Sequence, residues 1–499
     1  MIMFIYRNNA YDMKRGDFNK MGIIKKFFKR HRALIYFAAL IPFFVSCYGY
    51  YITGKFSFWE FVYAAIAVYF VNPVSEDVNA FILFGEITSV IVTASIILSV
   101  LKYAYAKIEH FFIRLRKDST VVYTDNDLGY ALASSLKHGY ATKNDSRPEK
   151  VKNHIVMFED DAKNITFYSQ NETRLKDQKV YMMMSELDST LLKATDTSEA
   201  DLHFFNTNEL LARDYWKKYN LYDHKRDSFK IAIIGENDVA EAIFKYGYLN
   251  NLYTLEQSFE YHIWGLTGAK ATFIGNLPTE NNDKIIIHKE SPFESCDSFR
   301  NIDRVIYCHE NNSIDMIQMI LYVNPTAEIH CYFKEETSYE DIYDSDKIIT
   351  FGALDDLLTE ESVKNESLYL QGKLFNYDYS LRYSERTAPS DYKNEMENEW
   401  KKLSGFKKSS SIARADHYWI EMKLKEDGIL SDEDEDALKI EHIRWSRFHF
   451  INHWSYAEKR DNERRRHNLL VPYEQLARSE KEKDGIYDAL IKKDIERLI

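Results

Sequence analysis

Hydrophobic positions near the N-terminus form three stretches with different lengths. Residues 33–53 contain no charged side chain, and residues 78–105 begin with an apolar run that only Glu86 interrupts as far as Leu101. Because about 20 apolar residues in a helix are enough to cross a bilayer, these two stretches predict two membrane spans. A buried helix of a soluble core is the alternative interpretation for each of them.

The third stretch, residues 58–73, lies between the other two and is too short for a full span. Lysine and arginine residues precede the first span and follow the second, whereas the intervening segment is mainly acidic. Positive charge marks the cytoplasmic side, so both ends of the chain are expected inside and the number of crossings must be even. We therefore predict that residues 58–73 enter the membrane and return, in a multi-pass protein of the inner (plasma) membrane.

Glu86 is the charged residue within the second apolar run. Ionisable residues in membrane spans usually face a bundle interior or a water-filled cavity. On a helix, Glu86, Ser89 and Thr93 share one face, so they are candidates to line a pore in a symmetric oligomer. The alternative is that Glu86 lies at the membrane interface and is hydrogen-bonded there.

A span, a re-entrant half-helix and a second span together resemble the pore module of two-span potassium channels. Alignment with the TVGYG filter of that family places the filter at Ile66, Ala67, Val68, Tyr69 and Phe70. Tyr69 matches, but Val68 and Phe70 replace glycines whose positive φ a carbonyl-lined filter needs. The resemblance implies a homotetramer that conducts inorganic ions through a pore without the potassium filter.

Strand-like and helix-like patterns alternate from residue 118 to residue 360. Two starts about 110 residues apart, Ser119–Tyr140 and Phe229–Asn251, each read as strand, turn and amphipathic helix. Further strands are expected within the segments 154–161, 179–184, 202–206, 261–266, 284–288, 304–310, 328–333 and 347–353. The alternation predicts two parallel Rossmann-like α/β domains, residues 118–227 and 228–360.

Both α/β domains are similar to the RCK (TrkA-N-like) regulatory domains of potassium channels and transporters. Asp303–Phe333 resembles the strand–helix–Pro–strand passage of that family, and His203–Trp216 resembles the end of its first lobe. The resemblance implies nucleotide or ion sensing and assembly into a cytoplasmic gating ring.

The dinucleotide fingerprint GxGxxG is degenerate in both domains. It reads Thr124-x-Asn126-x-x-Gly129 in the first domain and Gly235-x-Asn237-x-x-Ala240 in the second. Glycines are needed there because the backbone must approach a pyrophosphate at a helix N-terminus. Gly235, Asn237 and Ala240 are the candidate cofactor-binding residues, and the alternative is a structural lobe that binds no dinucleotide. No cofactor is therefore assigned.

The C-terminal part of the chain is expected to be mostly helical. Residues 361–411 read as a charged connecting segment with a loop at Lys407–Ser411, and residues 412–499 as a separate domain. Within it, Ala437–Asp484 resembles the ryanodine-receptor-type (RyR) domain through the pieces EHIRW and HNLLVPYEQL. The resemblance implies binding of a small ligand, and bacterial members accompany nucleotide-signalled conflict systems.

Arginine and tryptophan side chains of this domain are suited to a nucleotide-like ligand, because guanidinium groups bind phosphates and indoles stack on bases. The candidate residues are Glu441, His442, Arg444, Trp445, Arg447, Trp454, Arg464, Arg465 and Tyr473. The alternative places Trp445 in the core and the arginine run in solvent. His449 and His453 have zinc-like spacing without a third ligand in sequence, so no metal site is predicted.

Composition limits the remaining possibilities. The net charge of −12 argues against a nucleic-acid partner, and four scattered cysteines without a CxxC pair fit a reducing compartment. No plausible acid/base set accompanies the Rossmann-like domains, so no enzymatic activity is expected. We predict a ligand-gated ion channel with both termini cytoplasmic, and its bacterial associations suggest an antiphage effector. The alternative is a non-conducting, membrane-anchored ligand sensor or scaffold.

Overall fold

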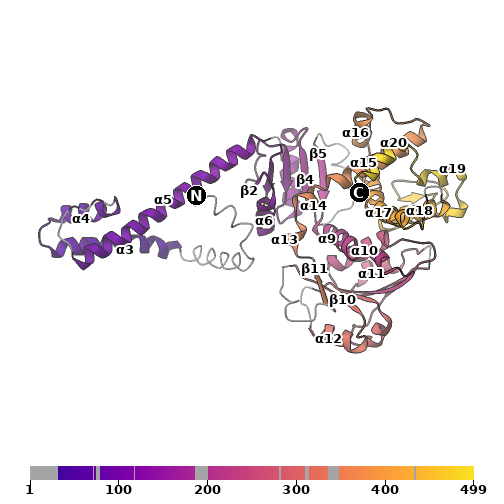
Figure 1. The fold of residues 1–499 in the computed structure, drawn as a ribbon, viewed down its shortest axis with the longest axis horizontal. Helices are drawn as coiled ribbons and strands as arrows, with labels where there is room; N and C mark the ends of the chain where they lie inside the picture. The colour runs from indigo at the N-terminus through magenta and orange to yellow at the C-terminus, as the bar shows by residue number, and fades with distance from the viewer. Residues whose placement is uncertain are drawn as a thin grey trace. The chain divides into compact units, whose positions relative to one another are not determined.

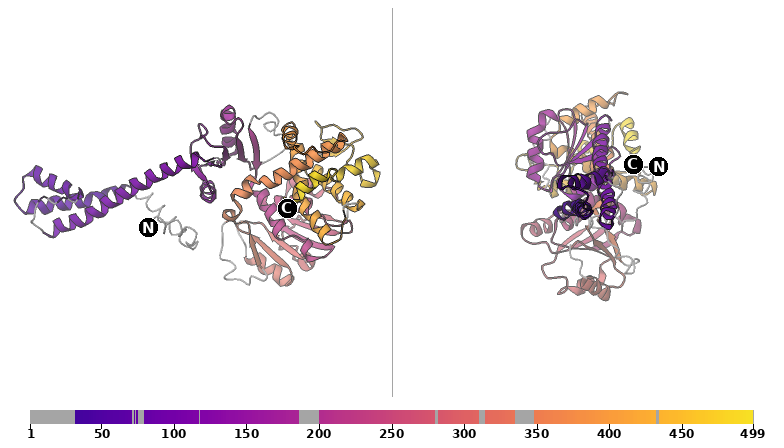
Figure 2. Two further views of the ribbon diagram at one scale, coloured as in Figure 1. Left: turned by 45° about the horizontal axis from the view of Figure 1, so that its top comes forward. Right: turned by 90° about the vertical axis from the view of Figure 1, so that its left-hand side faces the viewer.

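The fold was analysed in a computed structural model of the chain. The structure describes residues 32–70, 72, 74, 79–116, 118–185, 200–279, 282–309, 314–334, 348–431 and 434–498. The chain divides into two compact units, residues 1–112 and 113–499, which are described separately (Figures 1 and 2).

In the described residues of the first unit, two long helices have a short helix beside them. α3 (Arg32–Ile52) is followed by α4 (Phe58–Ala67), a 3-10 turn η1 (Val68–Phe70) and α5 (Ala80–Arg114), whose last residues belong to the second unit. A helix that ends in a tighter turn therefore occupies most of the predicted re-entrant stretch. Residues 71 and 73 of that stretch lie outside the described residues.

Small residues allow α3 and α5 to approach closely in this unit. A Cβ atom on Gly85 would come within 1.9 Å of the Ser46 hydroxyl, and one on Gly49 within 2.8 Å of Ile82. The Asn79 side-chain amide donates to the Gly49 carbonyl at 2.9 Å. Helix pairs that cross at small residues are common in membranes, where backbone proximity replaces the hydrophobic driving force.

One helical stretch among the described residues, Ala80–Leu98, is long and apolar enough to cross a membrane by length and composition. The apolar parts of the other helices, Ala39–Ile52 and Phe58–Phe70, are shorter. The side chains of residues 33–38, where the first predicted span begins, lie outside the described set. One crossing thus has a candidate helix, and the second crossing stays a prediction.

The second unit contains two parallel β-sheets. The first has the order β2-β1-β3-β4-β5 and the second the order β11-β10-β9-β6-β7-β8. The strands are β1 (Thr120–Tyr123), β2 (Gly139–Thr142), β3 (Asn153–Val156), β4 (Lys179–Met183), β5 (Asp201–Phe205), β6 (Ser228–Ile234), β7 (Ser258–Trp264), β8 (Lys284–Ile287), β9 (Arg304–Tyr307), β10 (Glu328–Tyr332) and β11 (Ile348–Phe351). Both sheets confirm the Rossmann-like prediction, although the short strand β2 was not expected because it begins with glycine and shows no clear alternation.

The two sheets nevertheless follow different topologies. Counted in chain order, the second sheet has the 3-2-1-4-5-6 order of dinucleotide-binding folds, and the first has the 2-1-3-4-5 order of flavodoxin-like folds. Among the described residues, the helices of these regions are α6 (Asp127–Ser135), α7 (Asp161–Asn171), α9 (Thr207–Lys218), α10 (Asp238–Asn250), α11 (Gly268–Gly275) and α12 (Ile314–Val323). The two domains are therefore related in pattern but are not copies of one arrangement.

Helices follow the second sheet to the end of the described chain, apart from a two-stranded pairing of β12 (Ser455–Tyr456) with β13 (Arg466–His467). They are α13 (Leu354–Leu357), α14 (Glu360–Lys364), α15 (Glu366–Tyr383), α16 (Lys393–Lys401), α17 (Gly405–Glu426), α18 (Glu435–Ile451), α19 (Arg478–Lys481) and α20 (Ala489–Glu496). This part confirms the prediction of a mostly helical C-terminal region.

The predicted loop at Lys407–Ser411 is wrong, because these residues lie inside α17. The connecting segment 361–411 contains α15, α16 and the start of α17. Because Gly372 has no side chain, Ile412 of α17 can pack closely against α15. A Cβ atom on Gly372 would lie 3.1 Å from the Ile412 side chain. The Ser411 hydroxyl donates back to the Lys407 carbonyl at 3.2 Å, which lets a serine run continue as a helix.

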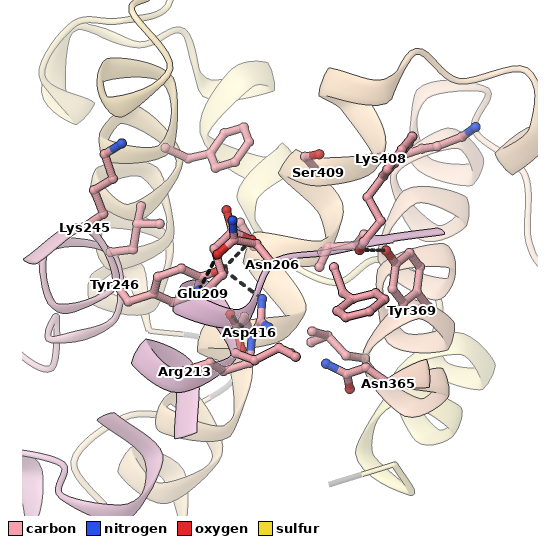
Figure 3. Close-up of a pocket in the computed structure, with 18 of the residues that line it drawn as sticks. Asn206, Glu209, Arg213, Lys245, Tyr246, Asn365, Tyr369, Lys408, Ser409 and Asp416 are labelled. Atoms are coloured by element: carbon pink, nitrogen blue, oxygen red, sulfur yellow. Dashed lines mark hydrogen bonds and ion pairs between the residues drawn. The ribbon is translucent and has the colours of Figure 1, made fainter. Parts of the chain in front are cut away.

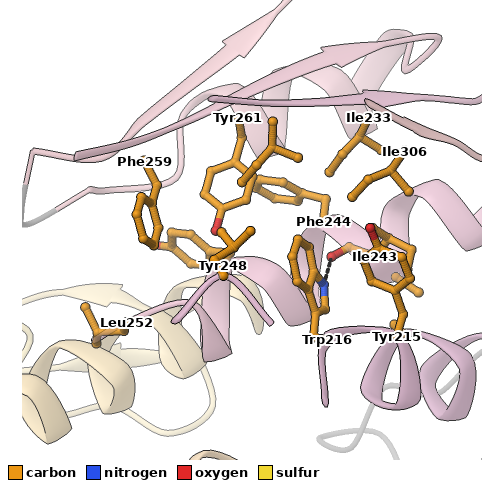
Figure 4. Close-up of a cluster of buried hydrophobic side chains, with 14 of the residues drawn as sticks. Tyr215, Trp216, Ile233, Ile243, Phe244, Tyr248, Leu252, Phe259, Tyr261 and Ile306 are labelled. Carbon is orange, nitrogen blue, oxygen red and sulfur yellow. Dashed lines mark hydrogen bonds between the residues drawn. The ribbon is translucent and has the colours of Figure 1, made fainter. Parts of the chain in front are cut away.

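Two connections cross between the sheets in opposite directions. α9 follows the first sheet in sequence, but Ala212, Tyr215 and Trp216 pack in the core of the second sheet with β6 and α10. The Trp216 indole N–H donates to the Ile243 carbonyl at 2.8 Å (Figure 4). α9 therefore packs on both sheets, because Leu210 belongs to the core of the first sheet, and the domain boundary at residue 227 stays a prediction.

The return connection begins after β11. Leu354, Leu358 and Val363 join the core of the first sheet, and the Lys364 ammonium donates to the Thr120 hydroxyl at 3.1 Å. The core of the second sheet thus includes α9, which lies between the two sheets in sequence, and the core of the first sheet includes residues that follow the second sheet. We call α9 the forward crossing, with its N-cap Asn206, and residues 354–369 the return crossing.

Candidate ligand-binding cavity

A cavity of about 260 Å³ lies where the two crossings meet the C-terminal helices. The forward crossing contributes Asn206, Glu209 and Arg213, and the return crossing contributes Asn365 and Tyr369. Its remaining polar and aromatic lining includes Lys245 and Tyr246 of α10, Lys408, Ser409 and Asp416 of α17, and Phe448 of α18 (Figure 3). Residues far apart in sequence therefore line one cavity with both polar and apolar walls.

Asn206 fixes the start of the forward crossing. Its side-chain oxygen accepts from the backbone amides of Asn208 and Glu209 at 2.8 and 3.0 Å. Its amide group donates to the Met184 carbonyl at 2.8 Å, at the end of β4. An N-cap of this kind satisfies amides that a helix leaves open, and here it also fixes the position at which the Glu209 side chain leaves the helix.

Arg213 joins the forward crossing to two other elements. Its Nε donates to Asp416 at 2.7 Å and one Nη donates to the Tyr246 hydroxyl at 2.9 Å. The Arg213 and Asp416 side chains keep 22% and 11% of their surface exposed, so the ion pair is open to the cavity. The guanidinium therefore ties α9, α10 and α17 together at a place that a small molecule can reach.

Glu209 adds a second carboxylate beside the same guanidinium. Its hydrogen bond from the Tyr246 hydroxyl is long, at 3.4 Å. Burial raises the pKa of Glu209, and the nearby Arg213 and Lys245 offset this only in part. A cavity with charged donors, charged acceptors and aromatic walls is suited to binding a polar small molecule.

In both sheets, the asparagine of the degenerate fingerprint makes hydrogen bonds that stabilise the fold. Asn237 caps α10 through the Ala240 amide at 3.1 Å and donates to the Cys308 carbonyl after β9 at 2.5 Å. Asn126 does the same in the first sheet, with the Gly129 amide at 2.8 Å and the Met157 carbonyl at 3.2 Å. Each asparagine bridges the two strands between which dinucleotides bind in such folds.

The turn after β7 also differs from dinucleotide-binding folds. There an acidic residue usually binds the ribose, but β7 ends at the buried Trp264, which stacks on His288 with ring centroids 3.9 Å apart. Gly265 follows with φ +95°, and a Cβ there would come within 2.7 Å of the Gly235 carbonyl oxygen. Gly265 thus allows the two turns to pack closely, and a Cβ on Gly235 would lie 3.0 Å from the Cys308 Cβ.

The arginine candidates of α18 form closed ion pairs. Arg447 is fully buried and donates to Asp283 and to the Tyr248 carbonyl, each at 2.8 Å. Arg444 contacts Glu441 through two hydrogen bonds of 2.7 and 2.8 Å. Burial opposes ionisation of Glu441, but Arg444 and Arg414 outweigh it and hold its pKa below the ordinary value. These contacts dock α18 inside the fold.

The other candidates of this region lie in two further environments. His442, Trp445, Trp454 and Tyr473 belong to a mostly buried group of rings around His449, in which Trp445 and His449 have centroids 4.0 Å apart. Burial lowers the pKa of His449 to about 3. Arg464 is 84% exposed, whereas Arg465 donates to the Asn452 carbonyl at 3.1 Å. The structure brings the rings together but separates them from the exposed arginine.

The pore candidates also separate into groups. The Ser89 hydroxyl lies within hydrogen-bond distance of two carbonyls, that of Val68 at 3.1 Å and that of Glu86 in its own helix at 2.9 Å, and the Thr93 hydroxyl donates to the Tyr69 carbonyl at 2.9 Å. Glu86 is half-buried within the chain. Ala67 is buried, whereas Ile66 and Phe70 are exposed. Ser89 and Thr93 thus face the end of the short helix inside one subunit.

Sequence reasoning did not identify the cavity. Asn206, Glu209 and Arg213 lie at i, i+3 and i+7, so they occupy one polar face of a helix whose other face is apolar. That signal was available within the segment His203–Trp216. The partners Tyr246, Tyr369 and Asp416 had no such signal, because tertiary packing alone brings them to α9.

The second unit thus combines two Rossmann-like parallel sheets with a helical C-terminal region. Residues 435–491, which run from the start of α18 into α20, match the RyR domain family, in agreement with the predicted resemblance there. A D-isomer specific 2-hydroxyacid dehydrogenase family protein from Aeromonas salmonicida subsp. salmonicida A449 is similar to the chain at 10% identity and a TM-score of 0.19, covering 55% of this chain and 98% of that one. A TM-score this low carries no argument about fold or activity. No curated protein matches the chain.

Proposed function

We propose that this protein is a membrane-anchored ligand sensor that controls an ion-conducting membrane module. A small polar molecule, for which a nucleotide is the leading candidate, binds in the cavity between the two crossings. The observation that carries the proposal is that both connections between the sheets line this one cavity. A ligand that contacts both connections can favour one arrangement of the sheets over another.

The physical requirement for such control is a difference in affinity between two arrangements. Arg213 satisfies part of this requirement, because it joins three helices through an ion pair that remains accessible. A ligand that competes for Arg213 or Asp416 would change how α9 is held against α17. Support for ligand sensing also comes from the RyR match at residues 435–491 and from the Rossmann-like sheets.

The membrane role rests on the first unit. Ala80–Leu98 is suitable for a span, and large apolar side chains such as Phe44, Ile91 and Leu98 are exposed on α3 and α5. Apolar surface of this extent is expected to contact lipid or other copies of the chain. In this proposal four copies surround a pathway for cations, with Glu86 facing it, and the cytoplasmic units respond to the ligand.

A second candidate function is a non-conducting anchored sensor. It is favoured by the hydrogen bonds that occupy the Val68 and Tyr69 carbonyls, because a potassium-type pathway needs such carbonyls for the ion. An NAD-dependent enzyme is not favoured, since Asn237 and Trp264 occupy the positions where the pyrophosphate and the ribose-binding carboxylate would lie.

The decisive experiment measures ligand-induced stabilisation of the full-length protein in detergent or nanodiscs. Mono-, di- and cyclic nucleotides are screened for a rise in melting temperature, which binding to the native state must produce. The proposal expects a hit whose effect is lost in Arg213→Ala and kept in the exposed control Arg464→Ala. The opposite pattern would move the ligand site to the basic loop of the RyR-matched region. Liposome flux with that hit then distinguishes the channel from the non-conducting sensor.

A further inference from the structure

The end of the short helix α4 is held inside the first unit by side chains of both neighbouring helices. Its three consecutive residues Ala67, Val68 and Tyr69 correspond to the middle of the filter in two-span potassium channels. The Tyr69 carbonyl accepts from Thr93, and the Val68 carbonyl lies 3.1 Å from the Ser89 hydroxyl, which shares its hydrogen between Val68 and the Glu86 carbonyl of α5. The Ala67 carbonyl accepts from the Asn72 amide at 3.3 Å. All three carbonyls therefore have donors within the same chain.

The Tyr69 side chain anchors the same turn to α3. Its hydroxyl donates to the Ala39 carbonyl at 2.7 Å and accepts from the Phe43 amide at 3.1 Å. These two backbone groups are four residues apart and would pair with each other in an uninterrupted helix. They flank Pro42, which lacks an amide hydrogen and already weakens the helix there. The hydroxyl is thus inserted beside the proline, a known cause of a bend.

These contacts have a simple physical origin. The last carbonyls of a helix have no partner within the helix, and an apolar environment offers no water to replace one. Ser89 and Thr93 are four residues apart, so they lie one turn apart on one face of α5 and meet successive carbonyls. We call Ser89, Thr93 and the Tyr69 hydroxyl the clamp.

We propose that the clamp positions α4 and that the carbonyls of Ala67, Val68 and Tyr69 do not coordinate permeating ions. A potassium filter works because carbonyl oxygens replace the hydration shell of the ion, and here the same oxygens accept hydrogen bonds toward α5 or within the turn. The inference rests on the proposed membrane role and specifies its selectivity: any pathway distinguishes cations from anions through Glu86 and separates K⁺ from Na⁺ weakly.

The first test needs no gating ligand. The melting temperature of the full-length protein in nanodiscs is measured in potassium, sodium and choline chloride at equal ionic strength, because an ion that binds the native state raises it. The inference expects equal values in potassium and sodium. A higher value in potassium than in sodium would overturn it, since carbonyls that replace the hydration shell of potassium would then bind that ion.

The second test measures the clamp directly by hydrogen exchange of peptides that contain Ala67–Asn72. Thr93→Val should exchange faster than wild type in these peptides, with Ser89→Ala as the milder variant. Thr88→Val is the matched control, because the Thr88 hydroxyl bonds to carbonyls of its own helix, at Phe84 and Gly85. Equal exchange in Thr93→Val and Thr88→Val would contradict the clamp.

Ion flux separates this inference from the proposed function. With a ligand that opens the pathway, the permeability ratio of potassium to sodium is expected within about threefold of one, because no carbonyl ring replaces the hydration shell. A strongly potassium-selective flux would refute the selectivity inference and leave the channel proposal intact. If no variant conducts under any ligand, the channel and its selectivity both fail, while hydrogen exchange still decides the clamp.

Discussion

Two arginines, Arg447 and Arg213, each tie helices of the second unit together, but in different surroundings. Arg447 and its partner Asp283 keep 0% and 1% of their side-chain surface, whereas Arg213 and Asp416 keep 22% and 11%. Asp283 also accepts the Phe259 amide at 2.7 Å. The first pair is therefore enclosed, and the second opens into a cavity with another carboxylate beside it.

The comparison separates structural charge from charge available to a ligand. A buried ion pair contributes little beyond what apolar packing would, but removal of one partner leaves an uncompensated charge. An accessible pair costs less to break, because water or a ligand can replace the lost partner. Arg447 is accordingly expected to matter for stability and Arg213 for binding, although both were accessible to the same kind of sequence argument.

The largest effect is expected from Arg447→Met. Removing the guanidinium leaves Asp283 buried without its cation, which should lower the free energy of unfolding by about 3–5 kcal/mol. Denaturant unfolding of the full-length protein, followed by tryptophan fluorescence, measures the loss. The double variant Arg447→Met/Asp283→Asn should recover part of it, because the uncompensated charge is then gone. A loss no larger than that of Arg213→Ala would contradict the distinction between the two pairs.

Arg213→Ala should have a smaller effect on stability, about 1–3 kcal/mol, which is typical of a lost hydrogen bond to a charged group. Asp416 remains next to the cavity, where water can solvate it. The same variant should abolish the melting-temperature shift caused by the ligand. Arg213→Lys keeps the charge but not the two directed bonds to Asp416 and Tyr246, so we expect weakened binding with nearly normal stability. Unchanged binding in both variants would remove the cavity from the mechanism.

The pH dependence of stability should report Glu209. Its pKa is raised in the folded state by burial, so the folded protein holds this proton more tightly than the unfolded chain does. Stability from this group is greatest below the ordinary glutamate pKa and decreases as pH rises through the folded value. Glu209→Gln should remove that part of the dependence, as measured by melting temperature between pH 4 and pH 8. An unchanged profile would show that Glu209 titrates normally.

Local patterns were sufficient for the sheets and insufficient for the site. β-branched runs such as Ile231–Ile234 and Arg304–Tyr307 identified buried parallel strands, because both faces of such a strand must be apolar. The serine run Ser409–Ser411 indicated a loop, but packing of Ile412 on Gly372 overrides this weak local preference. Tertiary contacts of this kind are not visible in one sequence.

The residue roles show the same limit. Arg444 and Arg447 were predicted to bind an anionic ligand, but in the structure they form ion pairs with Glu441 and Asp283. A sequence shows that an arginine is charged, but it does not show whether the side chain is buried. Glu209 and Arg213 could have been found from their shared helix face, whereas Asp416 lies 203 residues beyond Arg213 and is brought to it only by folding.

The smallest effect is expected from Arg464→Ala. This variant tests whether an exposed arginine outside the cavity contributes to stability or to ligand binding. Arg464 carries the same charge as Arg213, but it is 84% exposed and lies 3.9 Å from Asp461 in a loop between β12 and β13. Exposed ion pairs contribute little to stability because solvent screens them, so unfolding should be unchanged within error. If the ligand is held in the cavity, its dissociation constant should also be unchanged by isothermal titration calorimetry. A large loss of affinity with normal stability would instead identify the exposed loop of the RyR-matched region as the ligand contact. Arginines that bind the ligand would then differ from structural arginines by their exposure to solvent, and not by their position in the cavity.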